Sequence, residues 1–112
     1  MVPAFFIKRT MMELPADTQF NARTDEILAV ANAQLRNGQP VEQVAGSVTF
    51  AAAAFNAWMC MALSKDAEWM AKGRAQIVND LTERFRKMLE DNYETYLRDY
   101  ATHKTSTPRP VQ

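Results

Sequence analysis

Residues 50–63 read FAAAAFNAWMCMAL, in which Asn56 is the one polar amide. At 3.6 residues per turn, a helix through this segment is apolar on nearly every side. Extended back to Val41, it carries two apolar stripes on nearly opposite sides. The first consists of Val41, Val44, Val48, Ala52, Phe55, Met59 and Ala62, and the second of Phe50, Ala54, Ala57 and Met61. Such a helix needs two surfaces to pack against, so we predict a central helix or one shared between subunits.

A helix is also predicted before this segment, from about Asp17 to Asn37, because apolar side chains recur there at helical spacing. Asp17 is its expected N-cap, since a carboxylate can accept from the backbone N–H groups of the first turn. Asn37-Gly38 followed by Pro40 is a stop signal. Pro40 is expected to serve as the first residue of the apolar helix.

The third predicted helix is long, from about Ala67 to Tyr100, and Ser64 or Asp66 is expected to cap it. Apolar residues follow one of its faces. Oppositely charged residues stand four apart on what we interpret as its outer face: Asp80 and Arg84, Glu83 and Lys87, Arg86 and Glu90, Lys87 and Asp91, Glu94 and Arg98. The pattern predicts a helix with one solvated and one packed side.

These segments predict an all-α protein, a three-helix antiparallel bundle with a long C-terminal helix. Its alternatives are a monomer, whose first and third helices cover both stripes, and a dimer or higher oligomer built on the middle helix. Residues 1–16 are expected to be a flexible N-terminal segment and residues 17–101 a single helical domain. Residues 102–112, THKTSTPRPVQ, have no apolar period and two prolines, so we expect a disordered tail.

The composition disfavours several environments. Thirteen Lys plus Arg balance 13 Asp plus Glu, which argues against a long-range pull toward nucleic acid or anionic membrane but leaves a local charged patch open. The apolar run from Val48 to Leu63 falls short of the about 20 residues that span a bilayer, so no membrane segment is expected. Cys60 is the one cysteine and is interpreted as a buried, reduced thiol of a cytoplasmic protein.

The sequence contains few residues suited to catalysis or to metal binding. His103 is the one histidine and lies in the expected tail, so neither a carboxylate-histidine metal site nor a base for Cys60 is predicted. The acids Glu90, Asp91 and Glu94 stand beside basic residues and are interpreted as a solvated surface. We therefore expect no enzyme, no cofactor and no metal, and no catalytic or cofactor-binding residue is assigned.

The surface of the middle helix is the remaining candidate. Phe50, Ala54, Ala57, Trp58 and Met61 form the predicted interface, because small residues admit a neighbouring helix and large apolar ones fill beside them. The expected function is a non-catalytic interaction or assembly module that self-associates or binds an unidentified protein partner. The alternative is a small regulatory protein that associates with nucleic acid, which is disfavoured because no Arg or Lys lies between Phe50 and Leu63.

Three stretches resemble a small bacterial family of about this length, known only as a domain of unknown function. They are ANAQL at 31–35, VAGSVTFAAAAFNAW at 44–58 and RFRKMLEDNYETY at 84–96, within Phe20 to Tyr100. In that family a basic residue often precedes the Phe-Asn pair, whereas Ala54 does so here. The resemblance implies a helical fold and brings no known activity, cofactor or catalytic residue.

Overall fold

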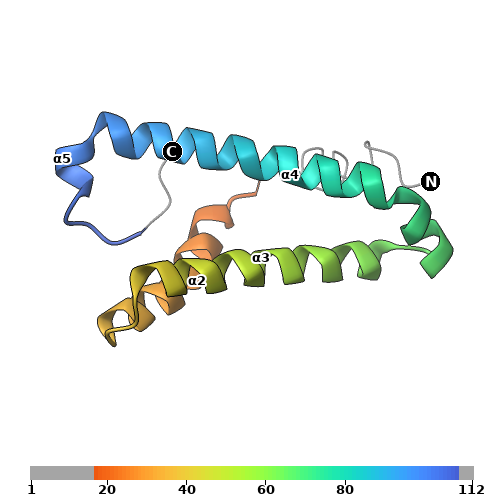
Figure 1. The fold of residues 1–112 in the computed structure, drawn as a ribbon, viewed down its shortest axis with the longest axis horizontal. Coiled ribbons are helices and arrows are strands. Elements are labelled where there is room, and N and C mark those ends of the chain that lie inside the picture. The colour runs from red at the N-terminus through yellow and green to blue at the C-terminus, as the bar shows by residue number, and fades with distance from the viewer. Residues whose placement is uncertain (1–16, 109–112) are drawn as a thin grey trace. The chain divides into compact units, whose positions relative to one another are not determined.

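A computed structural model describes residues 17–108, which form four helices and no strand (Figure 1). They are α2 (Phe20–Arg36), α3 (Val41–Leu63), α4 (Ala67–Arg98) and α5 (Tyr100–His103). The all-α class is confirmed, and the long helix near the C-terminus is present as α4. The expected flexible segment 1–16 lies outside the described residues, as do residues 109–112.

The described chain divides into two compact units. The first contains Asn56–Asp91, which is the end of α3 and most of α4. The second contains Thr18–Phe55 together with the described residues from Asn92 onward. A single domain over residues 17–101 and a three-helix bundle therefore stay predictions.

The turn between α2 and α3 has the hydrogen bonds that its sequence predicts. Gly38 adopts φ 87°, a left-handed conformation that glycine reaches without a Cβ penalty. Its N–H donates to the Leu35 carbonyl at 3.0 Å, and the Gln39 N–H donates to the Gln34 carbonyl at 3.1 Å. This pair of bonds is the Schellman motif, which satisfies carbonyls at the end of α2.

The two helix starts on either side of that turn differ slightly from the prediction. α2 begins at Phe20 with Gln19 at the N-cap and no side-chain capping bond, so the predicted cap at Asp17 is wrong. α3 begins at Val41, one residue later than expected. The Pro40 carbonyl accepts from the N–H groups of Gln43 at 3.1 Å and Val44 at 3.0 Å, which places Pro40 at the cap.

The turn between α3 and α4 is built by two side chains. The Ser64 hydroxyl donates to the Cys60 carbonyl at 2.6 Å and so closes the last turn of α3. The Trp69 N–H donates to Asp66 Oδ1 at 2.7 Å, and this bond caps α4. Of the two predicted caps, the structure selects Asp66.

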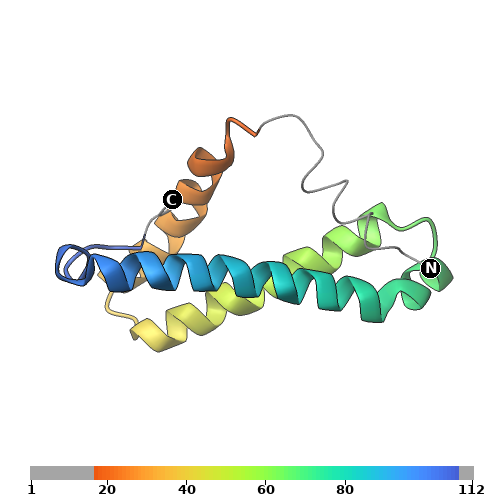
Figure 2. The same ribbon diagram turned by 90° about the horizontal axis from the view of Figure 1, so that it is seen from above.

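The core of the first unit lies where the end of α3 meets the start of α4, and the two segments run antiparallel and side by side (Figures 1 and 2). Cys60 and Ile77 are its buried centre, at 5% and 6% exposure. Partly buried apolar side chains pack against that pair: Met59, Trp69, Met70 and Leu81. Gly73 is also buried on α4. In the second unit the buried apolar residues are Ala31 and Val44.

The chain after α4 has more structure than the expected disordered tail at 102–112. α5 spans Tyr100–His103, and the His103 ring meets the Tyr96 ring edge-on at 4.8 Å between centroids. Asn32 Nδ2 donates to the Pro108 carbonyl at 3.1 Å. Ring packing and hydrogen bonds thus connect described residues of this segment, and the disordered tail at 102–112 stays a prediction.

Candidate interaction surface

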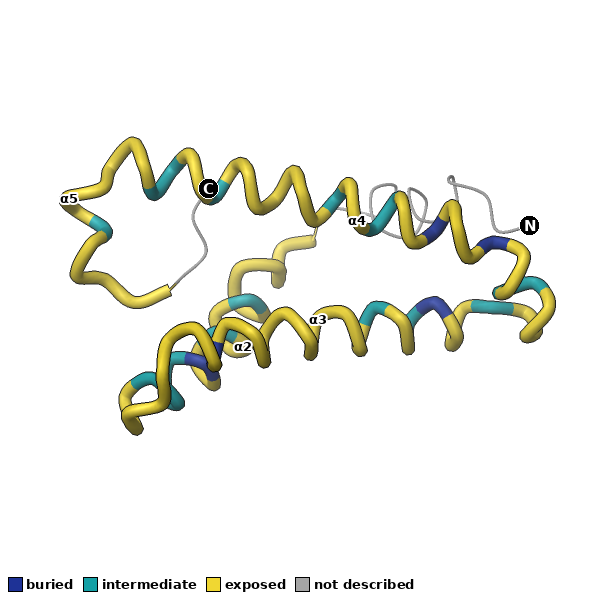
Figure 3. The backbone as a smooth tube through the Cα atoms, viewed as in Figure 1, coloured by how far each residue is buried: buried dark blue, intermediate teal, exposed yellow. Residues whose placement is uncertain are grey.

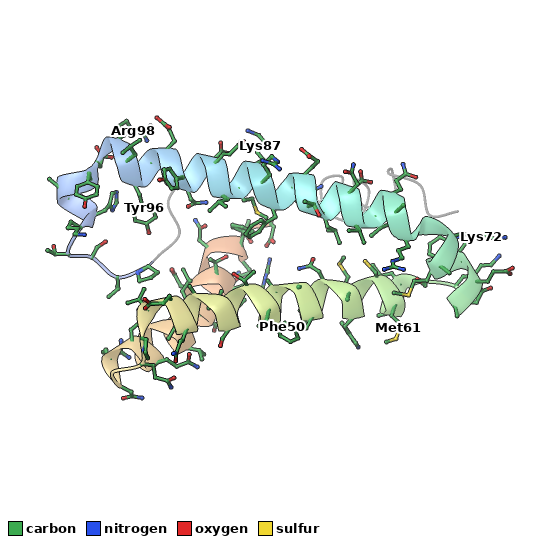
Figure 4. All side chains as sticks on the ribbon, viewed as in Figure 1. Phe50, Met61, Lys72, Lys87, Tyr96 and Arg98 are labelled. Atoms are coloured by element: carbon green, nitrogen blue, oxygen red, sulfur yellow. The ribbon has the colours of Figure 1, made fainter. Side chains whose placement is uncertain are left out.

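The five predicted interface residues lie along α3 and are all exposed. We call the side that carries Phe50, Ala54, Ala57, Trp58 and Met61 the Phe50–Met61 face. Eleven residues are close to three helical turns, so Phe50 and Met61 point in nearly the same direction. Figure 4 shows both side chains projecting from the same side of α3. Their exposed fractions are 75% and 55%, and that of Trp58 is 55%.

The other side of α3 is covered only near its C-terminal end. Cys60 is buried and Met59 is half-buried against Ile77 of α4. At 100° per residue, the direction midway between Met59 and Cys60 is largely opposite to the Phe50–Met61 face. Among the described residues of the first unit, α4 therefore covers one side of α3 and leaves the other exposed.

The first apolar stripe, which we expected to be the packed one, is also largely exposed. Val44 is buried and Met59 half-buried, whereas Val41 and Phe55 are exposed at 68% and 67%. Figure 3 shows α3 exposed over most of its length. Helical spacing identified which residues share a side, but it did not predict how little of the helix the described chain covers.

Apolar residues of α4 extend the exposed surface of the first unit. The residues concerned are Val78, Phe85, Met88 and Leu89. They belong to the face that we predicted to be packed, and only Ile77 among its large side chains is fully buried. Sequence reasoning missed them as surface residues because their periodicity is the same whether a partner helix belongs to this chain or to another.

The charges of the two long helices are distributed very differently. α3 has one charged side chain, Glu42 in its first turn. Three ion pairs run along α4: Glu68 with Lys72 at 3.8 Å, Glu83 with Arg86 at 3.8 Å, and Lys87 with Asp91 at 3.5 Å. Their side chains are all more than 60% exposed, so each pair contributes little to stability. The charged surface of the first unit is thus a solvated helix face.

Of the five predicted pairs, the structure confirms Lys87 with Asp91. Arg86 pairs with Glu83 instead of the predicted Glu90. Asp80 and Arg84 do not stand on the outer face as predicted, since both are half-buried. Asp80 Oδ2 and Arg84 Nε are buried and make no hydrogen bond within the described chain. The i, i+4 spacing alone could not show which side of α4 they occupy.

The thiol and the imidazole lie in separate units. Burial raises the pKa of the Cys60 thiol by desolvation, which favours its neutral form over the nucleophilic thiolate. His103 is half-buried beside Tyr96 in the second unit, although the sequence places it in the segment that we expected to be a tail. Residues 17–108 contain no group of three or more His, Cys, Asp or Glu side chains placed to hold a metal ion. Cys60 is a buried free thiol, as predicted.

α3 is a candidate membrane-spanning helix by its length and composition. The helix has 23 residues, and by length and composition it is apolar enough to cross a membrane. In its most apolar window 11% of the residues are buried within the chain. The core helix of a soluble protein meets the same two criteria.

A family model described as a protein of unknown function (DUF3144) matches residues 20–97. The match covers more than half of the chain and lies within the range over which the resemblance was expected, so that resemblance is confirmed. No curated protein matches the chain, and no solved structure matches it.

Proposed function

Because the chain belongs to the DUF3144 family, whose members are proteins of unknown function, we propose its role from its surface. It is a non-catalytic interaction and assembly module that acts through the apolar surface of α3. The observation that carries this proposal is the exposure of Phe50, Trp58 and Met61 on one side of a helix with a single charge. Its expected location is the cytoplasm.

The size of the exposed apolar area supports this proposal. Phe50, Trp58 and Met61, which share one side of α3, are 75%, 55% and 55% exposed. Since an aromatic side chain buries roughly 150–250 Å², the two rings leave roughly 200–300 Å² open, and Met61 adds to that area. The largest contiguous apolar patch on a typical monomer measures roughly 300–600 Å² and often has a function.

The charge distribution favours a protein partner over nucleic acid. A nucleic-acid surface needs cations that neutralise phosphates, and α3 contains neither Lys nor Arg. The cations of the first unit on α4 are interspersed with acids, as in the pair of Lys87 and Asp91 at 3.5 Å. No observation on the described residues therefore favours the alternative, a small regulatory protein that associates with nucleic acid.

Substitution of Ala57 by Glu tests the proposal. A carboxylate in the middle of the Phe50–Met61 face would be desolvated by any partner that covers it, so we expect at least tenfold weaker assembly. The measurement is the solution mass by light scattering over a wide concentration range, with circular dichroism to verify the helix content. Ala75→Glu is the matched control, because Ala75 is an exposed residue in the interior of α4.

We expect Ala75→Glu to assemble like the unchanged protein. If Ala57→Glu leaves the mass, the helix content and the capture of protein partners all unaltered, then the Phe50–Met61 face is neither interface nor core. That result would contradict the proposal.

A further inference from the structure

Four of the five residues of the Phe50–Met61 face are arranged symmetrically about one level along α3, and the exception is Trp58, whose symmetry-related position is Ala53. Phe50 and Met61 lie equally far from the middle of the bond between Phe55 and Asn56, and so do Ala54 and Ala57. These four positions therefore read large, small, small, large from either end. A two-fold axis perpendicular to α3 at this level, passing beside the helix on the side of the face, would bring equivalent positions of two copies together.

Resting on the proposed function, we propose that the occupant of this face is a second copy of the chain, packed antiparallel about a two-fold axis that passes beside the face at the level of Phe55 and Asn56. In such an isologous interface residue i meets residue j and j meets i. Phe50 then packs on the partner's Met61, and Ala54 on the partner's Ala57. Each contact occurs twice.

The side chains suit this register sterically. Alanines at the crossing point let two helix axes approach to roughly 8 Å, the short end of helix packing distances. Beside the crossing, the thioether of Met61 meets an aromatic ring, which is a favourable sulfur–aromatic contact. Trp58 lies at the edge of the face and covers the small side chains near the partner's Ala54. Large groups thus meet small or flexible ones along the contact.

Electrostatics favour the antiparallel over the parallel arrangement. Antiparallel helices place opposite ends of their dipoles side by side, whereas parallel helices place like ends together. Glu42 lies near the N-terminal end of α3 and carries its one charge. At 1.5 Å per residue the antiparallel pair separates the two Glu42 positions by roughly 40 Å along the axis, and a parallel pair places them together.

The area of the face agrees with what a specific dimer requires. Phe50 and Trp58 are 75% and 55% exposed, which leaves roughly 200–300 Å² open on the aromatic rings. With Met61 and the alanines the face presents roughly 500 Å², so two copies bury roughly 1,000 Å², the lower limit for a specific interface. An interface of that size is expected to form a weak or transient dimer.

Directed disulfide formation tests the register. In a Cys60→Ala background, Ala54→Cys and Ala57→Cys are prepared as separate proteins of different tag length, then unfolded and refolded together. A disulfide requires Cβ atoms within about 4.5 Å, so the antiparallel register predicts crosslinks between position 54 and position 57. A parallel register predicts crosslinks of 54 with 54 and of 57 with 57. Predominance of those homodimers would overturn the inference.

Light scattering on the same reduced proteins separates failure of the register from failure of the function. A dimer that forms no crosslink between 54 and 57 overturns the antiparallel register, while the assembly function survives. A monomer at every concentration overturns both self-association and register. A monomer that floats with phosphatidylcholine vesicles assigns the face to a bilayer and also overturns the inference.

Charge exchange gives a second test that does not depend on folding of the Cys60→Ala background. We expect Phe50→Lys and Met61→Glu each to weaken dimerisation at least tenfold, and the double variant to recover most of that loss, since Lys and Glu then meet twice. Tyr93→Lys is the control, because Tyr93 is 69% exposed on α4, away from the proposed contact. No recovery in the double variant would contradict the register.

Discussion

The two sides of α3 have similar apolar composition and different surroundings. Near the C-terminal end, Cys60 is buried at 5% exposure and Met59 packs beside it against Ile77. The Phe50–Met61 face of the same helix is exposed, with Phe50 at 75%. A single neighbouring helix can cover only one stripe of another, and among the described residues α4 covers that stripe only near the C-terminal end of α3. The exposed side is where function is to be sought.

The largest expected effect comes from the buried side. Ile77→Ala removes methyl groups from a site at 6% exposure and should lower the free energy of unfolding by about 2–4 kcal/mol, measured by urea denaturation. Its neighbour Val78, at 57% exposure, is the matched control, and Val78→Ala should cost less than about 1 kcal/mol in dilute solution. Equal losses at both positions would show that the two sides of the hairpin do not differ as described.

The exposed side should respond in the opposite way. Phe50→Gln removes an aromatic ring from the surface, so the free energy of unfolding at low concentration should change by no more than about 0.5 kcal/mol. Self-association should weaken roughly tenfold, because a ring in a packed contact is worth on the order of 1–2 kcal/mol. Analytical ultracentrifugation measures the second effect. A large loss of stability in the monomer would instead place Phe50 in the core.

A smaller effect on the free energy of unfolding is expected at the turn between α3 and α4. Asp66→Ala removes the carboxylate that accepts from the Trp69 N–H at 2.7 Å, which should cost about 1 kcal/mol of unfolding free energy. Asp66→Asn retains an acceptor and should recover most of that loss. If Asp66→Ala and Asp66→Asn destabilise equally, the charge and not the capping bond is what stabilises the start of α4.

The smallest effect is a gain in stability. A Cβ added at Gly46 of α3 would meet nothing within 4 Å in the described structure. Gly46→Ala should therefore raise the free energy of unfolding by about 0.5–1 kcal/mol through helix propensity alone. A loss in thermal unfolding experiments would mean that another chain approaches α3 closely at that position.

Local signals in the sequence predicted the ends of helices well. Asn37-Gly38 and Asp66 have short-range roles that depend only on nearby backbone groups, and the structure contains both. The start of α2 was placed too early, because Asp17 resembles a cap although Gln19 occupies that position. α5 was missed because four residues are too few to show a period, and the ring contact of His103 with Tyr96 is a tertiary feature.

Coverage of a helix side is harder to predict than its composition. The spacing of Phe50, Ala54, Ala57 and Met61 identified one side of α3, and its exposure is now visible. The half-buried positions of Asp80 and Arg84, and the exposure of Phe55, depend on which segments pack together. The apolar pattern of one chain shows which side of a helix is suited to burial. It does not show which segment or partner covers that side.

The mass of the unchanged protein in solution tests the central claim most directly. One chain weighs 12.7 kDa, and light scattering at increasing concentration should show a rise to twice that value or more. A mass of 12.7 kDa at every concentration, with no capture of protein partners and no binding to vesicles, would contradict the claim that the open side of α3 is an interaction surface.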